Sequence, residues 1–469
     1  MSVGLRMLAV VLAVAMPIAP GRSSPSAQPP IEDIVVTAAP VYRPLAELRG
    51  EERFPRGAQL LRIHQGRAEP LLPEFAASAD ADLSFDGSAL LFAGRRAAGD
   101  PWQIWELTLK NHSLRRVVSS PTSAERPFYL PGGRLVWAQQ TGHRFEIRSS
   151  DDGHPLNIVV LNPTAGPGVL PLTDLAASAF PAGVLQDGRI LFEAGYPLGV
   201  GSMPELYLVY ADGSGVESYR CDHGRARWGG RQLASGDVIF THGASLARFT
   251  SALAHEVPVD APRGDYAGAI AETSSGDWLV SARSAAGAPF ALERWRPGDA
   301  AMQTILTQRN LNLVDPAPMR PRVRPRRHPS GLHPWDYANL LALDARLSRS
   351  GDLKTAPASV RLETLDAKGR VVVTGKAPVE ADGSFFVQAP GDRPIRLALL
   401  DSRGNVVRRE QGWFWARGGE QRICVGCHTG PERAAENRVP LVLMHTTTPA
   451  DLTGSKADGT VQSVAREGH

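Results

Sequence analysis

Short apolar runs, each preceded by a polar turn that contains glycine, recur through the first two thirds of the chain. The turn glycines are Gly87, Gly133, Gly188, Gly236 and Gly276, which divide this region into stretches of similar length. The runs that follow them are Ser88–Phe92, Arg134–Trp137, Arg189–Phe192, Asp237–Phe240 and Asp277–Val280. Short apolar runs bounded by glycine turns are typical of β-strands. A repeat of about 40 to 55 residues matches one four-stranded blade of a β-propeller.

Each repeat also carries a second strand after the first, as in Gln103–Leu107 and Glu205–Tyr210. A further blade is completed if Ala58–Ile63 pairs with strands that follow Met302, and this closure removes the free sheet edges that promote aggregation. We therefore predict an all-β chain with a six-bladed β-propeller of the TolB or WD40 type over residues 57–315. The alternative is a pair of large β-sandwiches, which does not require a regular spacing.

The chain changes character after the repeats. From Pro316 to Pro329, proline alternates with arginine, and we expect an extended linker over residues 316–331 whose charges are solvated. The alternative is that one of these arginines pairs with an acidic partner. Residues 332–411 return to short alternating strands, as in Ser359–Leu365 and Ile395–Leu400. Strands at this spacing predict a small immunoglobulin-like β-sandwich.

The two ends of the chain lack the strand pattern. Arg6 followed by the apolar run Met7–Ala19 has the layout of a signal peptide. The run is short for a membrane span of about 20 residues. We expect a signal peptide over residues 1–20, a disordered or extended segment over 21–56 and a disordered tail over 448–469. The protein is therefore predicted to be exported, to the periplasm or beyond, and membrane-associated only if the signal segment stays uncleaved.

The net charge of +3 is too small to suggest a nucleic-acid partner or an anionic membrane surface. The 46 glycines and 38 prolines agree with a β protein rich in turns. Cysteine is scarce, with three in the whole chain, and Cys221 is expected to be a buried free thiol.

The other two cysteines stand in the run Cys424-Val425-Gly426-Cys427-His428, which is the C-x-x-C-H motif of c-type haem attachment. In this motif the two thiols form thioether bonds to the haem vinyl groups, and the histidine is the proximal iron ligand. A thioredoxin-like C-x-x-C would instead lie between a strand and a helix of a βαβ unit. A zinc site would need two further ligands, for example His445 and a distant histidine. The scarcity of cysteine favours one covalent haem c, bound within residues 412–447.

Met444 and His445 are the first methionine and the first histidine after His428, and they are candidates for the sixth iron position. His445 would give the haem a low reduction potential, and Met444 would raise it. Either ligand makes an electron carrier, whereas an open sixth position allows chemistry on a small molecule. The alternative for both side chains is a packing or surface role.

Three further groups are candidates for a site. The aromatic run Trp413–Trp415 either faces a porphyrin or fills the core of the sandwich. Arg417 and Arg422 can pair with haem propionates, or they are exposed charges with little effect. One of the arginines in residues 316–331 can pair with a haem propionate in the same way, as the alternative to a solvated linker. The polar stretch Asp222–Trp228 is a candidate for one mouth of the propeller, with a loop between blades as the alternative.

The runs Val379–Phe385, Leu399–Asp401, Trp413–Trp415, Gly419–Arg422 and Cys424–His428 together resemble the C-terminal part of the hydrazine synthase alpha subunit family. The resemblance covers roughly Gln59–Val442 and is looser over the predicted blades than over these C-terminal runs. It implies a β-propeller followed by a C-terminal monohaem region in which Cys424 and Cys427 carry the haem and His428 is its proximal ligand. That family has an additional haem domain before the propeller, which carries the active-site haem, and this sequence has one C-x-x-C-H motif and no room for that domain. Hydrazine synthesis is therefore not implied.

These features together predict a monohaem c-type cytochrome that exchanges electrons with a redox partner protein and uses the propeller as a docking platform. One alternative is a haem-dependent oxidoreductase that acts on a small molecule. Another is a non-redox propeller that binds a partner. No nucleophile–base pair or catalytic metal cluster is recognisable in the sequence, which favours an electron carrier over a stand-alone enzyme.

Overall fold

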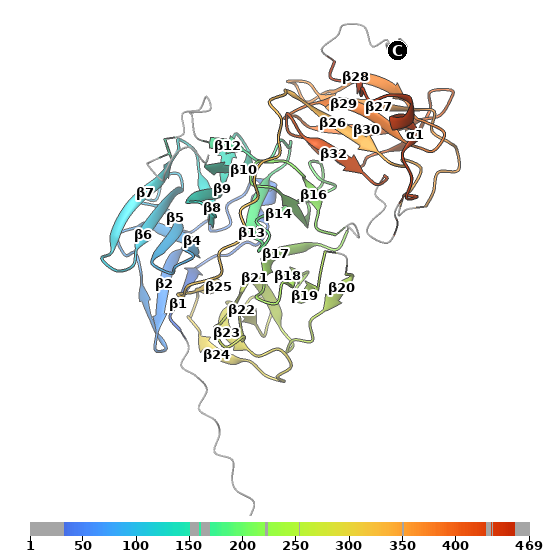
Figure 1. Cartoon of the computed structure of the whole chain (residues 1–469). Helices are drawn as coiled ribbons and strands as arrows, with labels where there is room; N and C mark the ends of the chain where they lie inside the picture. Colours follow the sequence, from blue (N-terminus) through green and yellow to red (C-terminus); the bar gives the residue numbers. More distant parts are fainter. Residues whose placement is uncertain are drawn as a thin grey trace, which may run out of the picture. The chain divides into compact units, whose positions relative to one another are not determined.

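The computed structural model describes residues 32–150, 159–160, 169–220, 224–252, 254–348, 351–427, 433 and 435–454. Within these ranges the chain forms eight β-sheets, one 3-10 helix, η1 (Ala46–Arg49), and one short α-helix, α1 (Leu441–His445) (Figure 1). In the described part of the chain, no helix is long and apolar enough to cross a bilayer. The predicted signal peptide, residues 1–20, lies outside the described residues.

The sheets between Ile34 and Pro318 form a β-propeller, and one edge strand of each lines a central cavity. In hydrogen-bonding order from that edge, the strands are β25 (Asn312–Pro318), β1 (Ile34–Ala39), β2 (Gln59–His64) and β3 (Arg67–Pro70); β4 (Ala77–Leu83), β5 (Ala89–Arg95), β6 (Gln103–Thr108), β7 (Ser113–Ser119) and β11 (Val159–Val160); β8 (Ala124–Leu130), β9 (Arg134–Thr141), β10 (Arg144–Ser150) and β12 (Val169–Pro171); β13 (Ala179–Val184), β14 (Ile190–Tyr196), β15 (Met203–Val209) and β16 (Glu217–Ser218); β17 (Arg227–Gln232), β18 (Val238–His242), β19 (Ser245–Phe249) and β20 (Glu256–Pro258); and β21 (Asp265–Glu272), β22 (Trp278–Arg283), β23 (Ala291–Trp295) and β24 (Gln303–Leu306).

Strand β1 joins the two ends of the propeller, because it lies between β2 and β25 and pairs antiparallel with both. All six of its residues are buried, as expected for a continuous apolar run with a strand on each side. The predicted closure brought the strand at Ala58–Ile63 together with strands after Met302, and β2 and β25 do share a sheet, with β1 inserted between them. The expectation of a disordered or extended segment over residues 21–56 is therefore wrong for β1 and η1.

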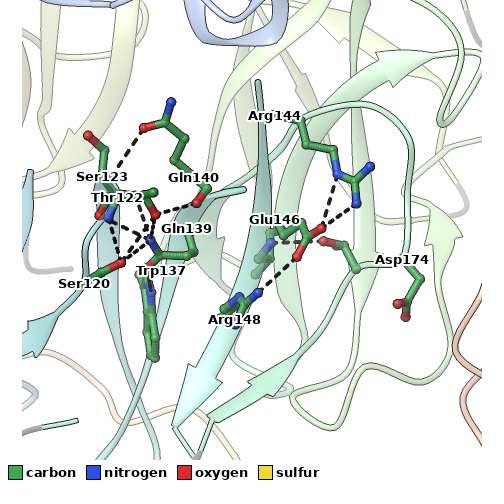
Figure 2. Close-up of polar contacts among 12 residues, drawn as sticks. Ser120, Thr122, Ser123, Trp137, Gln139, Gln140, Arg144, Glu146, Arg148 and Asp174 are labelled. Atoms are coloured by element: carbon green, nitrogen blue, oxygen red, sulfur yellow. Dashed lines mark hydrogen bonds and ion pairs between the residues drawn. The ribbon is translucent and has the colours of Figure 1, made fainter. Parts of the chain in front are cut away.

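One buried polar side chain of the blades, that of Gln139 on β9, is satisfied by hydrogen bonds to nearby residues (Figure 2). The side-chain amide of Gln139 donates from Nε2 to the hydroxyls of Ser120 and Thr122, both at 2.7 Å. Its Oε1 accepts from Nε1 of Trp137 at 3.2 Å. Since Ser120 and Thr122 belong to the crossover from β7 to β8, this amide fixes one sheet to the next, and its polarity is explained by the fold.

The remaining two sheets form a β-sandwich around one shared apolar core. One sheet has the order β32, β26, β29, β33 and the other β28, β27, β30, β31. Their bounds are β26 (Tyr337–Ala342), β27 (Ser359–Leu365), β28 (Val371–Pro378), β29 (Phe385–Pro390), β30 (Ile395–Leu400), β31 (Val406–Arg409), β32 (Gln421–Cys424) and β33 (Ala450–Asp451).

This sandwich departs from the predicted immunoglobulin-like one in two respects. Strands β32 and β33 pair parallel with β26 and β29, whereas immunoglobulin sheets are antiparallel. In addition, β32 comes from the expected haem segment, residues 412–447, and β33 from the expected disordered tail, residues 448–469. These late strands add hydrogen bonds to both edges of one sheet, so part of the segment that was expected to bind haem belongs to the sandwich.

The segment predicted as a solvated linker, residues 316–331, is bound to the propeller. Its first three residues belong to β25. Farther on, the backbone N–H of Arg322 donates to the carbonyl of Phe85 and that of Arg326 to the carbonyl of Gln186, each at 2.9 Å. The Arg322 side chain also pairs with the carboxylate of Asp82 at 2.6 Å. The arginines of this segment therefore serve partly as structural ion-pair partners.

Candidate functional site

Cys424 and Cys427 lie at one edge of the sandwich, at the end of β32. The carbonyl of Cys424 accepts from the N–H of Leu343 at 2.9 Å, and the N–H of Cys427 donates to the carbonyl of Leu347 at 3.0 Å. Both cysteines are free, half-buried and packed against the apolar core of the sandwich. One loop, residues 343–347, therefore supports both thiols. His428, the predicted proximal ligand, lies outside the described residues.

The electrostatic surroundings of the two thiols argue against a thioredoxin-like pair. Burial raises the pKa of Cys424, and burial together with the carboxylate of Glu410 raises the pKa of Cys427 to about 12. A redox C-x-x-C motif needs a thiol with a lowered pKa, usually at a helix N-terminus. These cysteines follow a strand instead. The described residues also contain no group of three His, Cys, Asp or Glu side chains arranged for a metal ion.

Large apolar side chains are exposed around this motif. Ile423 and Val425, which flank Cys424, are 66% and 39% exposed, and Val439 and Met444 in the following segment are 63% and 58% exposed. Monomeric proteins seldom leave apolar side chains exposed in groups without a partner or ligand. The thiols thus stand in a segment whose apolar surface the described residues do not cover.

Helix α1 carries both candidate distal ligands, Met444 and His445. Its first turn is fixed by the turn before β29, because the N–H groups of Leu441 and Val442 donate to side chains of that turn. The Nδ1 atom of His445 lies 3.0 Å from a carboxylate oxygen of Glu380, while most of the imidazole is exposed. A histidine whose Nδ1–H is held by a carboxylate presents Nε2 to a metal, an arrangement common among metal-binding histidines.

The aromatic run Trp413–Trp415 and its neighbouring arginines fasten the segment to the propeller. Trp415 is fully buried in an apolar cluster of propeller residues, and its Nε1 donates to the carbonyl of Gly213 at 2.9 Å. Arg417 pairs with Asp174, on the propeller side, at 3.3 Å. The side chain of Arg422 donates to the carbonyl of Trp415 at 3.3 Å and also to the carbonyl of Val216 in the propeller. Trp415 is therefore buried in the propeller, and not in the core of the sandwich as the alternative expected.

The predicted mouth residues have mixed outcomes. Asp222 and His223 lie outside the described residues, as does Cys221. Arg227 is fully buried and pairs with Glu205 and Glu256 within the propeller. Trp228, the next residue, lines the central cavity. The stretch therefore contains one residue at the propeller centre and one structural arginine.

A network of ion pairs that the sequence did not reveal lies at the propeller centre. Arg53, from the segment between β1 and β2, pairs with Asp80 on β4 and with Asp315 on β25. Arg126 on β8 pairs with Glu193 on β14 at 2.9 Å. Asp80, Arg126 and Asp315 all have positive φ values, of 61°, 50° and 55°, at bulges in strands that line the cavity. Strained residues of this kind concentrate at functional sites.

Two glycines show how closely the inner strands approach one another. Gly229 and Gly268 have φ values of 68° and 71° at the corresponding bulges of β17 and β21. A Cβ atom on Gly229 would lie 2.7 Å from the carbonyl oxygen of Gly268, and one on Gly268 would lie 2.8 Å from Oδ1 of Asp315. Only glycine fits both the backbone conformation and the space. A repeat alignment that singled out these bulges would have been the signal for the cavity.

Comparisons with known proteins agree with this architecture. Residues 345–429 match the family model described as the hydrazine synthase alpha subunit middle domain. Hydrazine synthase from Kuenenia stuttgartiensis is similar in structure, with a TM-score of 0.73 and 18% sequence identity over 89% of this chain and 72% of that chain. TolB from Acinetobacter baumannii is similar at a TM-score of 0.44 and 13% identity, over 61% of this chain and 66% of that chain. No curated protein matches the sequence.

The family match contains the sandwich strands from β27 to β32 in full, together with both cysteines of the motif. It therefore includes the part of the chain that carries the candidate site. The likeness to the Kuenenia structure shows a shared fold across most of the chain. The family match and this likeness together support a relation between this chain and the hydrazine synthase alpha subunit.

Proposed function

We propose that this chain is an exported monohaem c-type cytochrome that carries electrons and uses its propeller, built from six blades, to dock a redox partner protein. The observation that carries the proposal is the C-x-x-C-H segment itself, with Cys424 and Cys427 as free cysteines whose backbones bind to one loop, residues 343–347, at the edge of the sandwich. The relation to the hydrazine synthase alpha subunit supports it. Export is inferred from Arg6 and the apolar run Met7–Ala19.

The residues around the thiols fit a haem. Both thiols are free, as thioether formation requires, and exposed Ile423 and Val425 stand directly beside them. A large apolar group attached at Cys424 and Cys427 would cover such side chains, which removes their contact with water. When bound, the haem supplies one-electron exchange at its iron.

The protein's own residues then divide the remaining tasks. Cys424 and Cys427 would anchor the group covalently, and His428 would be its proximal ligand by its place in the motif. For the sixth position we favour His445 over Met444, because the carboxylate of Glu380 lies 3.0 Å from Nδ1 of His445 and leaves Nε2 as the ring nitrogen that could face a metal. A ligand held in this way would close the iron to small molecules, which suits an electron carrier better than an oxidoreductase.

The test is the visible spectrum of the ferrous protein with and without carbon monoxide. The wild type is expected to be six-coordinate and low-spin and to bind carbon monoxide slowly, whereas His445→Ala binds it at once. His64→Ala is the matched control, since Nδ1 of His64 also lies against a carboxylate, at 2.6 Å from Asp33, and its side chain is similarly exposed. Rapid binding by the wild type would favour the haem-dependent oxidoreductase. Opening by Met444→Leu and not by His445→Ala would assign the ligand to Met444.

A further inference from the structure

The central cavity of the propeller contains an arginine that lacks an ion-pair partner. The cavity has a volume of about 200 Å³, and Arg231, near the end of β17, lies in its wall. The guanidinium of Arg231 lies over the ring of Phe128, 4.9 Å from the centroid, and its Nη1 donates to the carbonyl of Gly230 at 3.0 Å. Across the described ranges, no carboxylate comes within ion-pair distance of it.

The carboxylates nearest in the cavity are already occupied by other donors. Asp315 accepts from Arg53 at 3.1 Å and from the N–H of Ala269 at 2.8 Å. Glu193 accepts from Arg126 at 2.9 Å and from the N–H of Gly229 at 2.5 Å. Asp82 accepts from Arg322 at 2.6 Å and from the N–H of Tyr129 at 2.9 Å. Each of the three acids has its own cation or backbone donors, and none has turned toward Arg231.

Arg231 is half-buried, so its guanidinium keeps only part of its contact with water while it has no ion-pair partner among the described residues. Burial lowers the pKa of Arg231, even though Asp315, Glu193 and Asp82 attract its charge from a distance. Charged groups removed from water are normally paired in folded proteins, and a planar guanidinium offers two parallel N–H groups that match a carboxylate. The missing partner of Arg231 is therefore best explained as a bound anion.

We propose that the central cavity binds a small carboxylate whose apolar body is about the size of a benzene ring, with the carboxylate held by Arg231. The size follows from the volume, since a cavity of roughly 150 Å³ accommodates benzene. The apolar body would rest against Phe128, Leu233 and Ile270, which line the cavity together with Arg231. This site is independent of the haem and lies in a different part of the chain.

The acids around the cavity make a cation the competing occupant. If Asp82, Glu193 and Asp315 dominated the potential, the cavity would attract an amine of the same size and reject a carboxylate. Benzoate is an anion and benzylamine a cation of similar size, so the two compounds serve as matched probes of the sign of charge that the cavity accepts.

Isothermal titration calorimetry of the full chain with sodium benzoate and with benzylamine tests the proposal. Benzoate is expected to bind saturably with a one-to-one stoichiometry, and benzylamine is expected not to bind. Arg231→Gln should weaken benzoate binding at least about tenfold, because charge-assisted hydrogen bonds to the carboxylate are lost. Arg231→Lys keeps the charge and loses the paired N–H geometry, so it should bind benzoate with intermediate affinity. Arg309→Gln, at an exposed position outside the cavity, should bind as the wild type does.

The circular dichroism melting curve of each variant shows whether it is folded. If Arg231→Gln is not folded, the benzoate affinity of Arg231→Lys tests the proposal in its place. Equal benzoate affinity in the wild type and in a folded Arg231 variant would overturn the proposal. Binding of benzylamine in place of benzoate would do the same, and so would the absence of benzoate binding to the wild type at tens of millimolar.

Discussion

Replacing Trp415 by alanine should destabilise the chain strongly, because this side chain fastens the segment before the haem motif to the propeller. Trp415 is fully buried among propeller residues, and its ring centroid lies 6.3 Å from that of Phe192 on β14. Its Nε1 donates to the carbonyl of Gly213 at 2.9 Å. The substitution removes both the packing and the hydrogen bond.

The magnitude follows from the buried area. A tryptophan buries about 200 Å², and about 25 cal/mol per Å² gives roughly 5 kcal/mol, within the range of about 3–5 kcal/mol measured for such truncations. Trp415→Phe keeps most of the apolar contact and loses the hydrogen bond to Gly213, so we expect a cost of about 1–2 kcal/mol. The free energy of unfolding is measured by urea denaturation, followed by far-ultraviolet circular dichroism.

Trp335 provides the matched control, since it is 38% exposed and stacks on His333 and Tyr337 at the surface. Trp335→Ala should cost about 3 kcal/mol by the same area estimate, against roughly 5 kcal/mol for Trp415→Ala, because only the buried part of its side chain, roughly 125 Å², is lost. If Trp415→Ala costs no more than Trp335→Ala, the segment before the haem motif is not packed into the propeller, and the reasoning fails.

Three further predictions, with four substitutions, test other parts of the structure. Gly268→Ala should cost about 2–4 kcal/mol of unfolding free energy, because of the left-handed backbone and the clash with Asp315. Gly276→Ala, at a φ of 80° with open space around it, should cost only about 1–2 kcal/mol. Thermal unfolding compares the two variants. Arg53→Met should cost about 3–5 kcal/mol in urea denaturation because Asp80 and Asp315 lose a buried partner. The pKa of Glu363 lies below its ordinary value of 4.5, because hydrogen bonds from Arg396 and Arg361 outweigh the opposing effect of burial; its stabilisation is therefore present above the unfolded pKa and is lost as the pH falls through the folded pKa. Melting temperatures between pH 3 and pH 6, roughly the range that brackets a carboxylate titration, should fall less steeply with acid in Glu363→Gln than in the wild type, and parallel curves would contradict this.

The repeating part of the fold is visible in the sequence for a physical reason. Each blade needs a tight turn before its second strand, and glycine at positions such as 87 and 188 supplies the positive φ that the turn requires. Strand β1 was not predicted because it has no such turn before it and because it pairs with β25, the last strand of the propeller in the sequence. Strand β33 escaped for a similar reason, since it is very short and its partner, β29, precedes β30, β31 and β32 in the chain.

The candidate sites also differ in how far the sequence alone could predict them. Cys424 and Cys427 are proposed as haem-binding residues from their spacing alone, because haem attachment requires both thiols next to the ligating histidine. The network of Arg53 with Asp80 and Asp315 joins residues up to 262 positions apart, so only the closed propeller brings them together. Arg231 could not be singled out from the sequence, because its proposed role depends on the lack of an ion-pair partner among the described residues.

Covalent haem attachment is the most direct test of the central claim. The full chain is co-expressed with a cytochrome c maturation system, and the purified protein is run on a denaturing gel and stained for haem peroxidase activity. The wild type is expected to stain and to gain the mass of one haem, and the variant with both Cys424→Ser and Cys427→Ser to do neither. An unstained wild type of unmodified mass, or a double variant that still stains, would contradict the assignment of this chain as a c-type cytochrome.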